Sequence, residues 1–390
     1  MAEERYDLVV VGAGPGGSNA AAVALRGGLR VAQIDKEQFP RVKPCAGGVT
    51  MKTCRALRLD WAPSVRATWS EIEFNLWHGD RHRFTHRSRP VVRLVSRLEF
   101  DNALVEQNLE QPRFRLVSGE RVLDARHDGT FTVRTESRTL RAPQLIAADG
   151  AYSTINRIFG VARPQASAVA IEVNVPKDAV DIDVEPAMCF DFGAIEAGYG
   201  WVFPKDDHWS VGLYTYRRGV KGLRQRLLSY VAAKGLTPRS HAALQFEAHQ
   251  VPVGGYRLAR IGLPLYVVGD AGGFADALTG EGIYHAVESG RIAGETAIAV
   301  HHGASRAELR YHARLWRTVL PDTWVTYHAS QYFYRHLRMG TRSLAAPGVW
   351  RALMEGYADS ATFSRTLALS PRYIARSLVR RTVLHQTNPG

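Results

Sequence analysis

Six residues near the N-terminus have the types and spacing of a site that binds the diphosphate of a dinucleotide. Residues 12–17 read Gly-Ala-Gly-Pro-Gly-Gly and directly follow an apolar run. In this pattern Gly12 makes a tight turn, Gly14 lets the diphosphate approach the main chain, and Gly17 lets a helix pack closely on a strand. Because the helix opened by Pro15 presents free N–H groups at its start, its N-terminus attracts an anion. The motif therefore predicts dinucleotide binding.

A carboxylate stands where the ribose of such a ligand would lie. Asp35 ends a second apolar run, roughly 20 residues after Gly12, where a carboxylate accepts hydrogen bonds from a ribose 2′-hydroxyl. We expect Lys36, the next residue, to belong to the same site. An acid at this position disfavours a 2′-phosphate, so the site is not expected to hold NADP.

Two further segments place an aspartate in a turn at the end of a predicted buried strand. Residues 148–153 read Ala-Asp-Gly-Ala-Tyr-Ser, and residues 268–273 read Val-Gly-Asp-Ala-Gly-Gly. In an open α/β sheet, ligands collect at the carboxyl ends of the strands. We therefore expect Asp149 and Asp270 to lie near the same ligand, although either one, taken singly, also fits a turn or a helix cap.

The elements that must position these residues begin with a βαβ unit. The pattern predicts a strand over 6–11, a helix over 15–27 and a strand over 30–34. Ser96 and Glu99 form a capping box, which predicts a helix to about residue 109. Further strands are predicted within 113–142 and at 144–148, 168–175, 187–192, 200–203, 209–215, 246–253 and 265–268, and further helices at 222–234, at 282–300 and over most of the remainder.

Composition limits the class of protein. The 390 residues are 45% apolar and 22% charged, as expected of a globular chain with two or three structural units. Cys45, Cys54 and Cys189 are too few and too scattered for a disulfide scaffold or a zinc cluster, so a reducing compartment and no metal site are expected. The N-terminus lacks the layout of a signal peptide, and no stretch reaches the ~18 uninterrupted apolar residues of a spanning helix. We expect a cytoplasmic protein.

The order of the three motifs resembles the flavoprotein hydroxylase superfamily, whose fold is that of p-hydroxybenzoate hydroxylase. The resemblance implies that residues 12–17 bind the diphosphate of FAD and that Asp270 contacts its ribityl chain and diphosphate. It also implies that Arg97 reaches the phosphates and that the helix start at 280–283 points N–H groups at the flavin pyrimidine ring. The cofactor-binding residues expected on this basis are Gly12, Gly14, Pro15, Gly17, Asp35, Lys36, Arg97, Asp149, Asp270, Gly280, Gly282 and Ile283.

Three segments are similar to the geranylgeranyl reductase family of this superfamily. Residues 39–48 look like its Lys-x-Cys-Gly-Gly loop, and residues 199–204 look like its Tyr-x-Trp-x-Phe-Pro box. Residues 269–283 look like its Gly-Asp-Ala-Ala-Gly…Leu-Thr-Gly-Glu-Gly-Ile segment. The resemblance covers roughly residues 5–300.

This sequence departs from the family pattern in three places. Ala46 stands where the family often has Gly, and Ala277 stands where it usually has Pro before Leu-Thr-Gly-Glu-Gly. Tyr214 replaces the second glycine of the Gly-x-Gly that follows the Phe-Pro box. Because Ala277 loosens a turn beside the flavin and Tyr214 narrows the pocket, these departures put the substrate in doubt more than the cofactor.

The resemblance implies an α/β fold with three parts. These are a Rossmann-like FAD domain of the p-hydroxybenzoate hydroxylase type, an inserted antiparallel-sheet substrate domain, and a helical C-terminal region. The expected bounds are 1–75, 96–160 and 255–305 for the FAD domain, 76–95 and 161–254 for the substrate domain, and 306–390 for the basic helical region.

The resemblance further implies an oxidoreductase that reduces carbon–carbon double bonds of a prenyl or other apolar polyene with a hydride from reduced flavin. Holding the double bond and excluding water are tasks that suit aromatic walls. The aromatic residues also fit an ordinary sheet core, and Cys45 also fits a buried inert thiol, with no histidine placed by sequence to activate it. The candidate catalytic residues are Cys45, Tyr199, Trp201 and Phe203.

The main alternative is an FAD-dependent monooxygenase that acts on an apolar or aromatic small molecule. A halogenase would show Trp-x-Trp-x-Ile-Pro, whereas Tyr199 and Phe203 stand at the outer aromatic positions here, so a hydroxylase is the stronger form of this alternative. The chain has a single Gly-x-Gly-x-x-Gly, so no separate nicotinamide domain is visible. The expected electron donor is NAD(P)H that docks transiently or a ferredoxin-like carrier.

The positive charge is concentrated in the last quarter of the chain. From residue 301 to the end there are thirteen Arg, no Lys and four acids, so that 13 − 4 = +9 of the net +13 lies there. Arginines among aromatic residues are typical of a surface that meets phosphates, including those of a lipid membrane, although a solvated helical face is the alternative. No nucleic-acid motif is present, so no nucleic acid partner is expected, and peripheral membrane contact fits a lipid-linked substrate.

Overall fold

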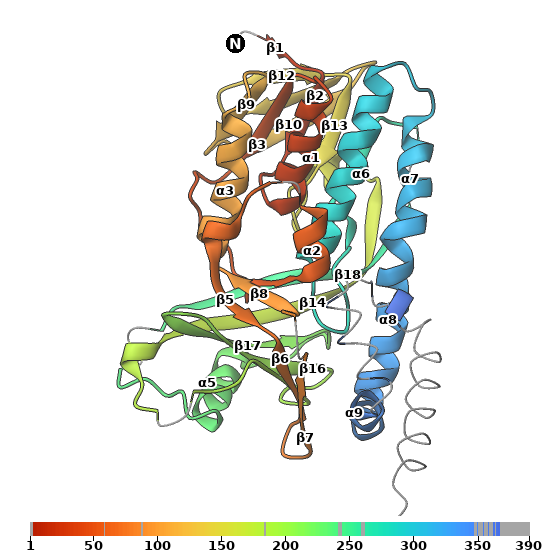
Figure 1. Ribbon diagram of the computed structural model, residues 1–390. Helices are drawn as coiled ribbons and strands as arrows, with labels where there is room; N and C mark the ends of the chain where they lie inside the picture. The colour runs from red at the N-terminus through yellow and green to blue at the C-terminus, as the bar shows by residue number, and fades with distance from the viewer. Residues whose placement is uncertain are drawn as a thin grey trace, which may run out of the picture.

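The computed structural model describes residues 3–57, 59–86, 89–182, 185–240, 244–258, 262–346, 349, 354, 358, 362 and 364–366. In this part of the chain the backbone forms four β-sheets. Figure 1 shows a parallel sheet flanked by helices in the upper half and a large, mostly antiparallel sheet below it. The expected α/β class, with a separate, mostly antiparallel sheet beside the parallel one, is confirmed.

A five-stranded parallel sheet forms the centre of the upper half. Its middle strands are buried along their whole length, which is why they read as continuous apolar runs. The first strand begins at Leu8, later than expected, because residues 3–5 pair with another sheet. The strand order of this parallel sheet is β19 (Leu265–Val267), β13 (Gln144–Ala147), β2 (Leu8–Val11), β3 (Val31–Asp35) and β9 (Phe114–Ser118).

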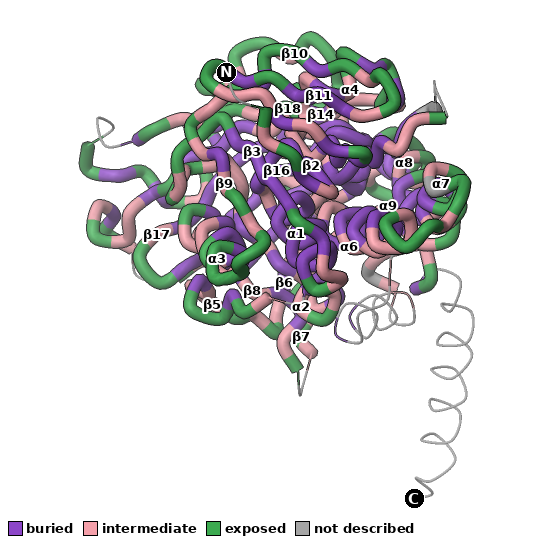
Figure 2. The backbone as a smooth tube through the Cα atoms, turned by 90° about the horizontal axis from the view of Figure 1, so that it is seen from above, coloured by how far each residue is buried: buried purple, intermediate pink, exposed green. Residues whose placement is uncertain are grey.

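Three helices accompany this sheet: α1 (Pro15–Arg26), α3 (Arg97–Leu109) and α6 (Ile283–His301). A Cβ added at Gly290 of α6 would lie 2.2 Å from the carbonyl oxygen of Gly16, so α1 and α6 touch backbone to backbone. Figure 2 shows α1 within the buried interior of the molecule. The expected capping box on α3 does not form, because the Ser96 side chain makes no cap hydrogen bond and Glu99 pairs with Arg66.

A four-stranded sheet and a three-stranded sheet adjoin the parallel sheet and its helices. The first consists of β1 (Glu3–Arg5), β12 (Thr139–Ala142), β11 (Phe131–Thr135) and β10 (Val122–His127), and the short helix α4 (Thr154–Phe159) lies near β10. The second consists of β4 (Gly48–Thr50), β8 (Val92–Val95) and β5 (Val65–Trp69), next to α2 (Met51–Ala56) and the 3-10 turn η1 (Ala62–Ser64).

The large sheet of the lower half has seven strands and is antiparallel except for one parallel pair, β6 with β15. Helix α5 (Leu223–Ala233) packs against its face opposite the parallel sheet. The strand order is β18 (Phe246–Leu258), β14 (Ala162–Pro176), β17 (His208–Thr215), β16 (Gly198–Pro204), β15 (Cys189–Phe192), β6 (Glu71–Leu76) and β7 (Arg81–Thr85), with the 3-10 turn η2 (Lys177–Ala179) after β14.

Two strands near the expected domain bounds pair in a way that the sequence did not indicate. The bound between residues 75 and 76 falls inside β6, all of which belongs to the large sheet. Residues 92–95, expected in the same domain, instead form β8 and pair with β4 and β5. Local alternation of apolar and polar residues does not reveal which sheet a short strand joins.

The helices α7 (Ala307–Thr318), α8 (Leu320–Arg335) and α9 (Leu337–Ala345) run down one side of both halves. Tyr311 and Leu315 of α7 pack into the core of the parallel sheet, and Phe333 of α8 contacts Phe192 of the large sheet with ring centroids 4.9 Å apart. These helices are therefore integral to both cores. Most of the expected helical region after residue 346 lies outside the described residues.

Candidate functional site

A single continuous cavity of about 590 Å³ extends from the glycine loop before α1 to the large sheet. It is bounded by the carboxyl ends of β2, β3 and β13, by the loop before β4, by the start of α6 and by one face of the large sheet. Among the predicted site residues, those that line it are Gly12, Gly14, Pro15, Asp35, Lys36, Cys45, Arg97, Asp149, Tyr199, Trp201, Phe203, Asp270, Gly280, Gly282 and Ile283.

Each glycine of the first motif meets a different structural requirement. Gly12 has φ +102°, and a Cβ there would lie 2.1 Å from the carbonyl oxygen of Ala148. A Cβ at Gly17, which packs outside the cavity lining, would lie 2.1 Å from the carbonyl oxygen of Gly12. At Gly14 the nearest atom to such a Cβ is the Nη2 of Arg41, 3.6 Å away. The space beside Gly14 therefore belongs to the cavity, next to the N-terminus of α1.

Asp35 orders this loop as well as lining the cavity. Its carboxylate accepts hydrogen bonds from the main-chain N–H of Ala13 at 2.7 Å and from that of Glu37 at 3.0 Å. Lys36 lies at the rim, where its half-exposed ammonium is 3.7 Å from the carboxylate of Glu37. The second strand and the glycine loop are thus held in register by the acid that was predicted to bind the ribose.

Arg97 is held by a buried carboxylate. The two oxygens of Asp101 accept bonds from Nε and Nη2 of Arg97 at 2.8 and 2.7 Å, and Asp101 also pairs with Arg41 at 2.9 Å. Asp101 is fully buried, whereas both arginines line the cavity. The carboxylate raises the pKa of Arg97 above its usual range, against the opposing effect of burial. The pair Arg41 and Arg97 therefore presents fixed positive charge to the cavity.

The two predicted aspartates at the strand ends, Asp149 and Asp270, differ in the groups that they contact. The carboxylate of Asp149 accepts bonds from the Ser153 hydroxyl at 2.5 Å and from the N–H of Thr154 at 2.7 Å, so it caps α4. This is the alternative that the sequence left open, and burial raises the pKa of this carboxyl. Asp270 lies in the 3-10 turn η4 (Gly269–Gly272) after β19, and a Cβ at Gly282 would be 3.4 Å from its Oδ1.

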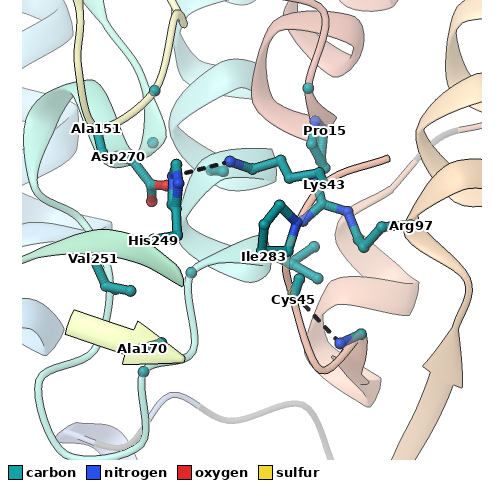
Figure 3. A pocket seen from close by; sticks show the side chains of 18 of the residues that line it. Pro15, Lys43, Cys45, Arg97, Ala151, Ala170, His249, Val251, Asp270 and Ile283 are labelled. Atoms are coloured by element: carbon teal, nitrogen blue, oxygen red, sulfur yellow. Dashed lines mark hydrogen bonds between the residues drawn. The ribbon is translucent and has the colours of Figure 1, made fainter. Parts of the chain in front are cut away.

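Sequence reasoning missed a basic pair opposite Asp270. Nζ of Lys43 lies 3.2 Å from Nε2 of His249 on β18, and Figure 3 shows both side chains beside Asp270. Burial lowers the pKa of Lys43, and burial together with Lys43 lowers the pKa of His249 to about 4. His249 is therefore neutral at physiological pH. The two residues are far apart in the sequence, so no local pattern joins them.

The start of α6 is fixed from both sides. Gly280 has φ +71°, which favours glycine, and Glu281 accepts a hydrogen bond from the Thr50 hydroxyl at 2.6 Å and pairs with the buried Lys52 at 2.7 Å. Gly282 and Ile283 then begin the helix with no side-chain cap. The free N–H groups of this first turn therefore face the cavity.

Aromatic hydroxyls hold the loop before α6. Tyr199 donates to the carbonyl of Thr279, Tyr214 to that of Ala277 at 3.1 Å, and Tyr334 to that of Leu278 at 2.7 Å. The rings of Tyr199 and Tyr214 are stacked with centroids 5.1 Å apart. Burial raises the pKa of Tyr199, which keeps its phenol neutral. Tyr199 therefore lines the cavity and holds the loop through Thr279, and it is not placed to act as an acid.

Beyond these tyrosines the cavity is an apolar chamber. Phe190 packs edge-on against Phe203 with centroids 5.2 Å apart and stacks on Phe74 at 5.1 Å. Trp201 donates its indole N–H to the hydroxyl of Ser210 at 3.2 Å and so leaves its ring as wall. The apolar residues that line this chamber are Ile72, Phe74, Val91, Val92, Ala170, Met188, Phe190, Tyr199, Trp201, Phe203, Tyr214 and Val251.

Cys45 lies between the charged part of the cavity and the chamber. Its thiol is free, and its sulfur accepts a contact from the N–H of Gly47 at 3.4 Å (Figure 3). Its main-chain N–H donates to Oε1 of Glu172 at 2.5 Å. Sequence reasoning missed Glu172, and the signal available was one carboxylate within the apolar run that became β14.

Residues 5–309 match the family model of the FAD binding domain. Digeranylgeranylglycerophospholipid reductase of Methanocella arvoryzae is 32% identical over 75% of this chain and 77% of its own length. The chain belongs to the geranylgeranyl reductase family of FAD-dependent oxidoreductases.

Another relative and two solved structures are also similar to this chain. The menaquinone reductase of Mycolicibacterium smegmatis is 30% identical to this geranylgeranyl reductase family member, over 75% of this chain and 76% of its own length. A geranylgeranyl bacteriochlorophyll reductase-like protein of Thermoplasma acidophilum superposes with a TM-score of 0.75 at 20% identity, over 96% of each chain. A flavin-dependent brominase superposes with a TM-score of 0.73 at 18% identity, over 96% of this chain and all of the other. At these identities the two structures show the fold alone.

FAD, the cofactor of this family, fits the cavity. The free space beside Gly14 adjoins the N-terminus of α1 and the fixed charges of Arg41 and Arg97, which suit a diphosphate. The N-terminal turn of α6 lies on another wall of the same cavity, where it suits the flavin ring. The expected cofactor is confirmed, and the role of each predicted binding residue stays a prediction.

We predict that Gly14→Val abolishes FAD binding and leaves the protein folded. The added side chain would fill the space beside α1, yet its Cβ has room because Arg41 Nη2 is 3.6 Å away. FAD released by acid from the purified variant, together with its thermal midpoint against FAD-stripped wild type, checks this. Ala299→Val on α6, outside the cavity lining, is the control and should keep its FAD. A yellow Gly14→Val protein would contradict the placement of the diphosphate.

We predict that Asp101→Asn weakens both the fold and FAD retention. The change removes the buried carboxylate between two arginines and should lower the free energy of unfolding by about 3–5 kcal/mol. The control is Glu196→Gln, because Glu196 also pairs with an arginine, Arg226, but at an exposed site, where a loss of about 0–1 kcal/mol is expected. Denaturant titrations of both variants measure the difference, and equal losses would contradict it.

Proposed function

We propose that this protein reduces carbon–carbon double bonds of a prenyl or other apolar polyene substrate. One observation carries the proposal: the cavity that accommodates FAD continues without interruption into an aromatic chamber on the large sheet. The family membership supports it, since relatives named for geranylgeranyl lipids and menaquinone share about 30% identity with this chain. A chamber lined by aromatic and aliphatic side chains suits a hydrocarbon chain better than a small polar substrate.

In this proposal each part of the cavity has its own task. Bound and reduced FAD supplies a hydride. Phe190, Trp201 and Phe203 hold the polyene and keep water away from it, because their rings form the chamber wall. Tyr199 keeps the loop before α6 in place through its bond to Thr279. The electrons that reduce FAD come from NAD(P)H or a ferredoxin-like carrier.

We further propose that Cys45 shields the boundary between the cofactor and the substrate and forms no covalent intermediate. Its thiol contacts the N–H of Gly47 and interacts with the guanidinium of Arg97, and its main-chain N–H donates to Glu172. Arg97 is a cation and takes no proton, and the Glu172 oxygen that contacts Cys45 accepts its main-chain N–H and not its thiol proton.

The outer faces of α7 and α8 support a membrane contact. Trp316, Trp324 and Tyr332 are 63%, 52% and 59% exposed. Exposed arginines accompany them, including Arg317 on α7 and Arg335 on α8. Aromatic rings at the interface and arginines toward lipid phosphates are the two features of a peripheral membrane surface. Among the described residues no helix is long and apolar enough to cross a bilayer. We propose that this face meets anionic lipid.

We predict that the FAD-loaded protein, reduced with dithionite without oxygen, adds two hydrogens per double bond to geranylgeranyl diphosphate or menaquinone, as read by mass spectrometry. Phe203→Ala should slow this by about 10–100-fold, because the chain loses its position at the chamber wall. Phe246→Ala is the matched control: this ring packs with Arg224 outside the cavity lining, and the rate should be nearly unchanged.

Two further results bear on this assay. Cys45→Ser should keep FAD and part of the rate, whereas a covalent adduct on Cys45 during turnover would contradict its shielding role. Products that gain oxygen in air, with no hydrogen gain under anaerobic conditions, would overturn the reductase and favour the monooxygenase.

We predict that the protein sediments with anionic vesicles at low salt and is released at high salt, since exposed charges are screened over ~8–10 Å at physiological ionic strength. Replacing Arg310, Arg317 and Arg335 by Gln should weaken this binding about a hundredfold, at about 1 kcal/mol for each arginine. The control replaces three exposed arginines of other elements, Arg115 of β9, Arg126 of β10 and Arg134 of β11, by Gln. Protein that stays in the supernatant at low salt would show that this face is only solvated.

A further inference from the structure

Glu172 is a carboxylate in an unusual place. It lies in β14, the second of the seven strands of the large sheet, where it pairs in register with Gly212 of β17 and Glu247 of the edge strand β18. Its neighbours Ile171 and Val173 are buried in the core on the opposite face, whereas Glu172 lines the cavity with only 7% of its surface exposed. Burying a carboxyl group costs free energy, so its presence on a reaction chamber calls for a function.

The two oxygens of Glu172 are not equivalent. Oε1 accepts the main-chain N–H of Cys45 at 2.5 Å, which fixes the side chain. Oε2 is buried and has no hydrogen-bond partner among the described residues. A buried acceptor without a donor is costly, and a protonated oxygen in the same place can donate instead. One oxygen is thus held by the main chain of Cys45, and the other is a buried polar atom without a partner on a residue that lines the cavity.

The surroundings of Glu172 favour its acid form near neutral pH. Burial raises its pKa to about 7, and Glu247 on β18 acts in the same direction. Lys205 after β16, the N–H of Cys45 and Arg97 of α3 act in the opposite direction. Lys205 is itself 5% exposed, and burial lowers its pKa, which weakens it as a counter-charge. Glu172 therefore stands near the midpoint between acid and carboxylate.

Two other titratable groups of the cavity, Tyr199 and His249, are poorly placed to give a proton. The hydroxyl of Tyr199 already donates to the carbonyl of Thr279, and burial raises the pKa of this phenol. His249 is neutral near pH 7 and contacts Lys43. Glu172 has one oxygen without a hydrogen-bond partner and a pKa raised to about 7. It also lies beside Cys45, where the charged part of the cavity meets the apolar chamber.

We propose that Glu172 is the catalytic residue that donates the proton to the substrate double bond. The inference rests on the proposed function. A hydride from reduced FAD forms a C–H bond with one alkene carbon, and the O–H bond of Glu172 breaks as its proton forms a C–H bond with the other. The alkene gains two hydrogens, FAD is left oxidised, and Glu172 is left as a carboxylate beside Lys205. Solvent returns the proton, and the electron donor reduces FAD again.

The first test reads the protonation of Glu172 directly, with no substrate. Infrared difference spectra of the FAD-loaded protein, recorded as a pH titration, should show a carboxylic acid band that disappears with a midpoint near pH 7. Glu172→Gln should lose this band while keeping an oxygen for the N–H of Cys45. Glu73→Gln is the matched control, because Glu73 lies outside the cavity lining on the same sheet and pairs with Arg83. A midpoint near the ordinary glutamate value of about 4.3 would overturn the proposal.

The second test follows one turnover of the dithionite-reduced protein with the polyene that wild type reduces. Glu172→Gln should bind FAD normally yet transfer hydrogen about 10²–10⁴-fold more slowly, as expected when a general acid is lost. In wild type the rate should fall as the pH rises through about 7, because Glu172 loses its proton. This fall in rate should be absent in the variant. Glu73→Gln should keep the wild-type rate and its fall with pH.

The outcomes separate this inference from the proposed function. If wild type reduces the polyene and Glu172→Gln does so at the same rate, the proton donor is another group and the reductase stands. If wild type reduces none of the polyenes, the proposed reductase activity and the proposed role of Glu172 are both wrong, whatever the infrared titration shows. If the variant does not fold, the fall in rate with pH and the infrared midpoint of wild type decide, and either one away from neutral pH overturns the role of Glu172.

Discussion

The whole cavity depends on the close approach of main chains around the first glycine loop. Gly12 lies against the carbonyl of Ala148, and Gly16 lies against Gly290, with no side chain between them. These contacts bring the start of α1, the end of β13 and the middle of α6 to one junction. Any larger side chain would separate the three elements, so the space for the diphosphate exists only because these positions carry no Cβ.

From this junction the cavity changes character along its length. The end near the glycine loop is charged, with Arg97 and Arg41 anchored by Asp101, and the end on the large sheet is apolar and aromatic. The loop before α6 lines the same cavity and is held by tyrosine hydroxyls from both β16 and α8. The helices after α6 are therefore part of the site's support, which explains why α8 packs into the large-sheet core.

Buried ionisable groups cluster where the two ends meet. Glu172 and Lys43 line the cavity, Lys205 lies behind Gly47 of its lining, and burial shifts the pKa of each toward the value that favours its neutral form. Such groups lower stability unless they are paired, and perturbed pKa values cluster at functional sites. A chamber that excludes water but holds one carboxyl group with a pKa raised to about 7 is well suited to a reaction that needs one proton in an apolar place.

The sequence alone determined the glycine loop, Asp35, the βαβ unit and the aromatic box, because turns, helix starts and alternating strands depend on neighbouring residues. The capping role of Ser96 was wrong, since Glu99 found a tertiary partner in Arg66. The tertiary structure decided which strands share a sheet and which buried groups meet. Glu172 contacts Cys45 across 127 positions and Lys43 contacts His249 across 206, and such pairs arise only when packing brings distant segments to one cavity, a constraint that leaves no local pattern in the chain.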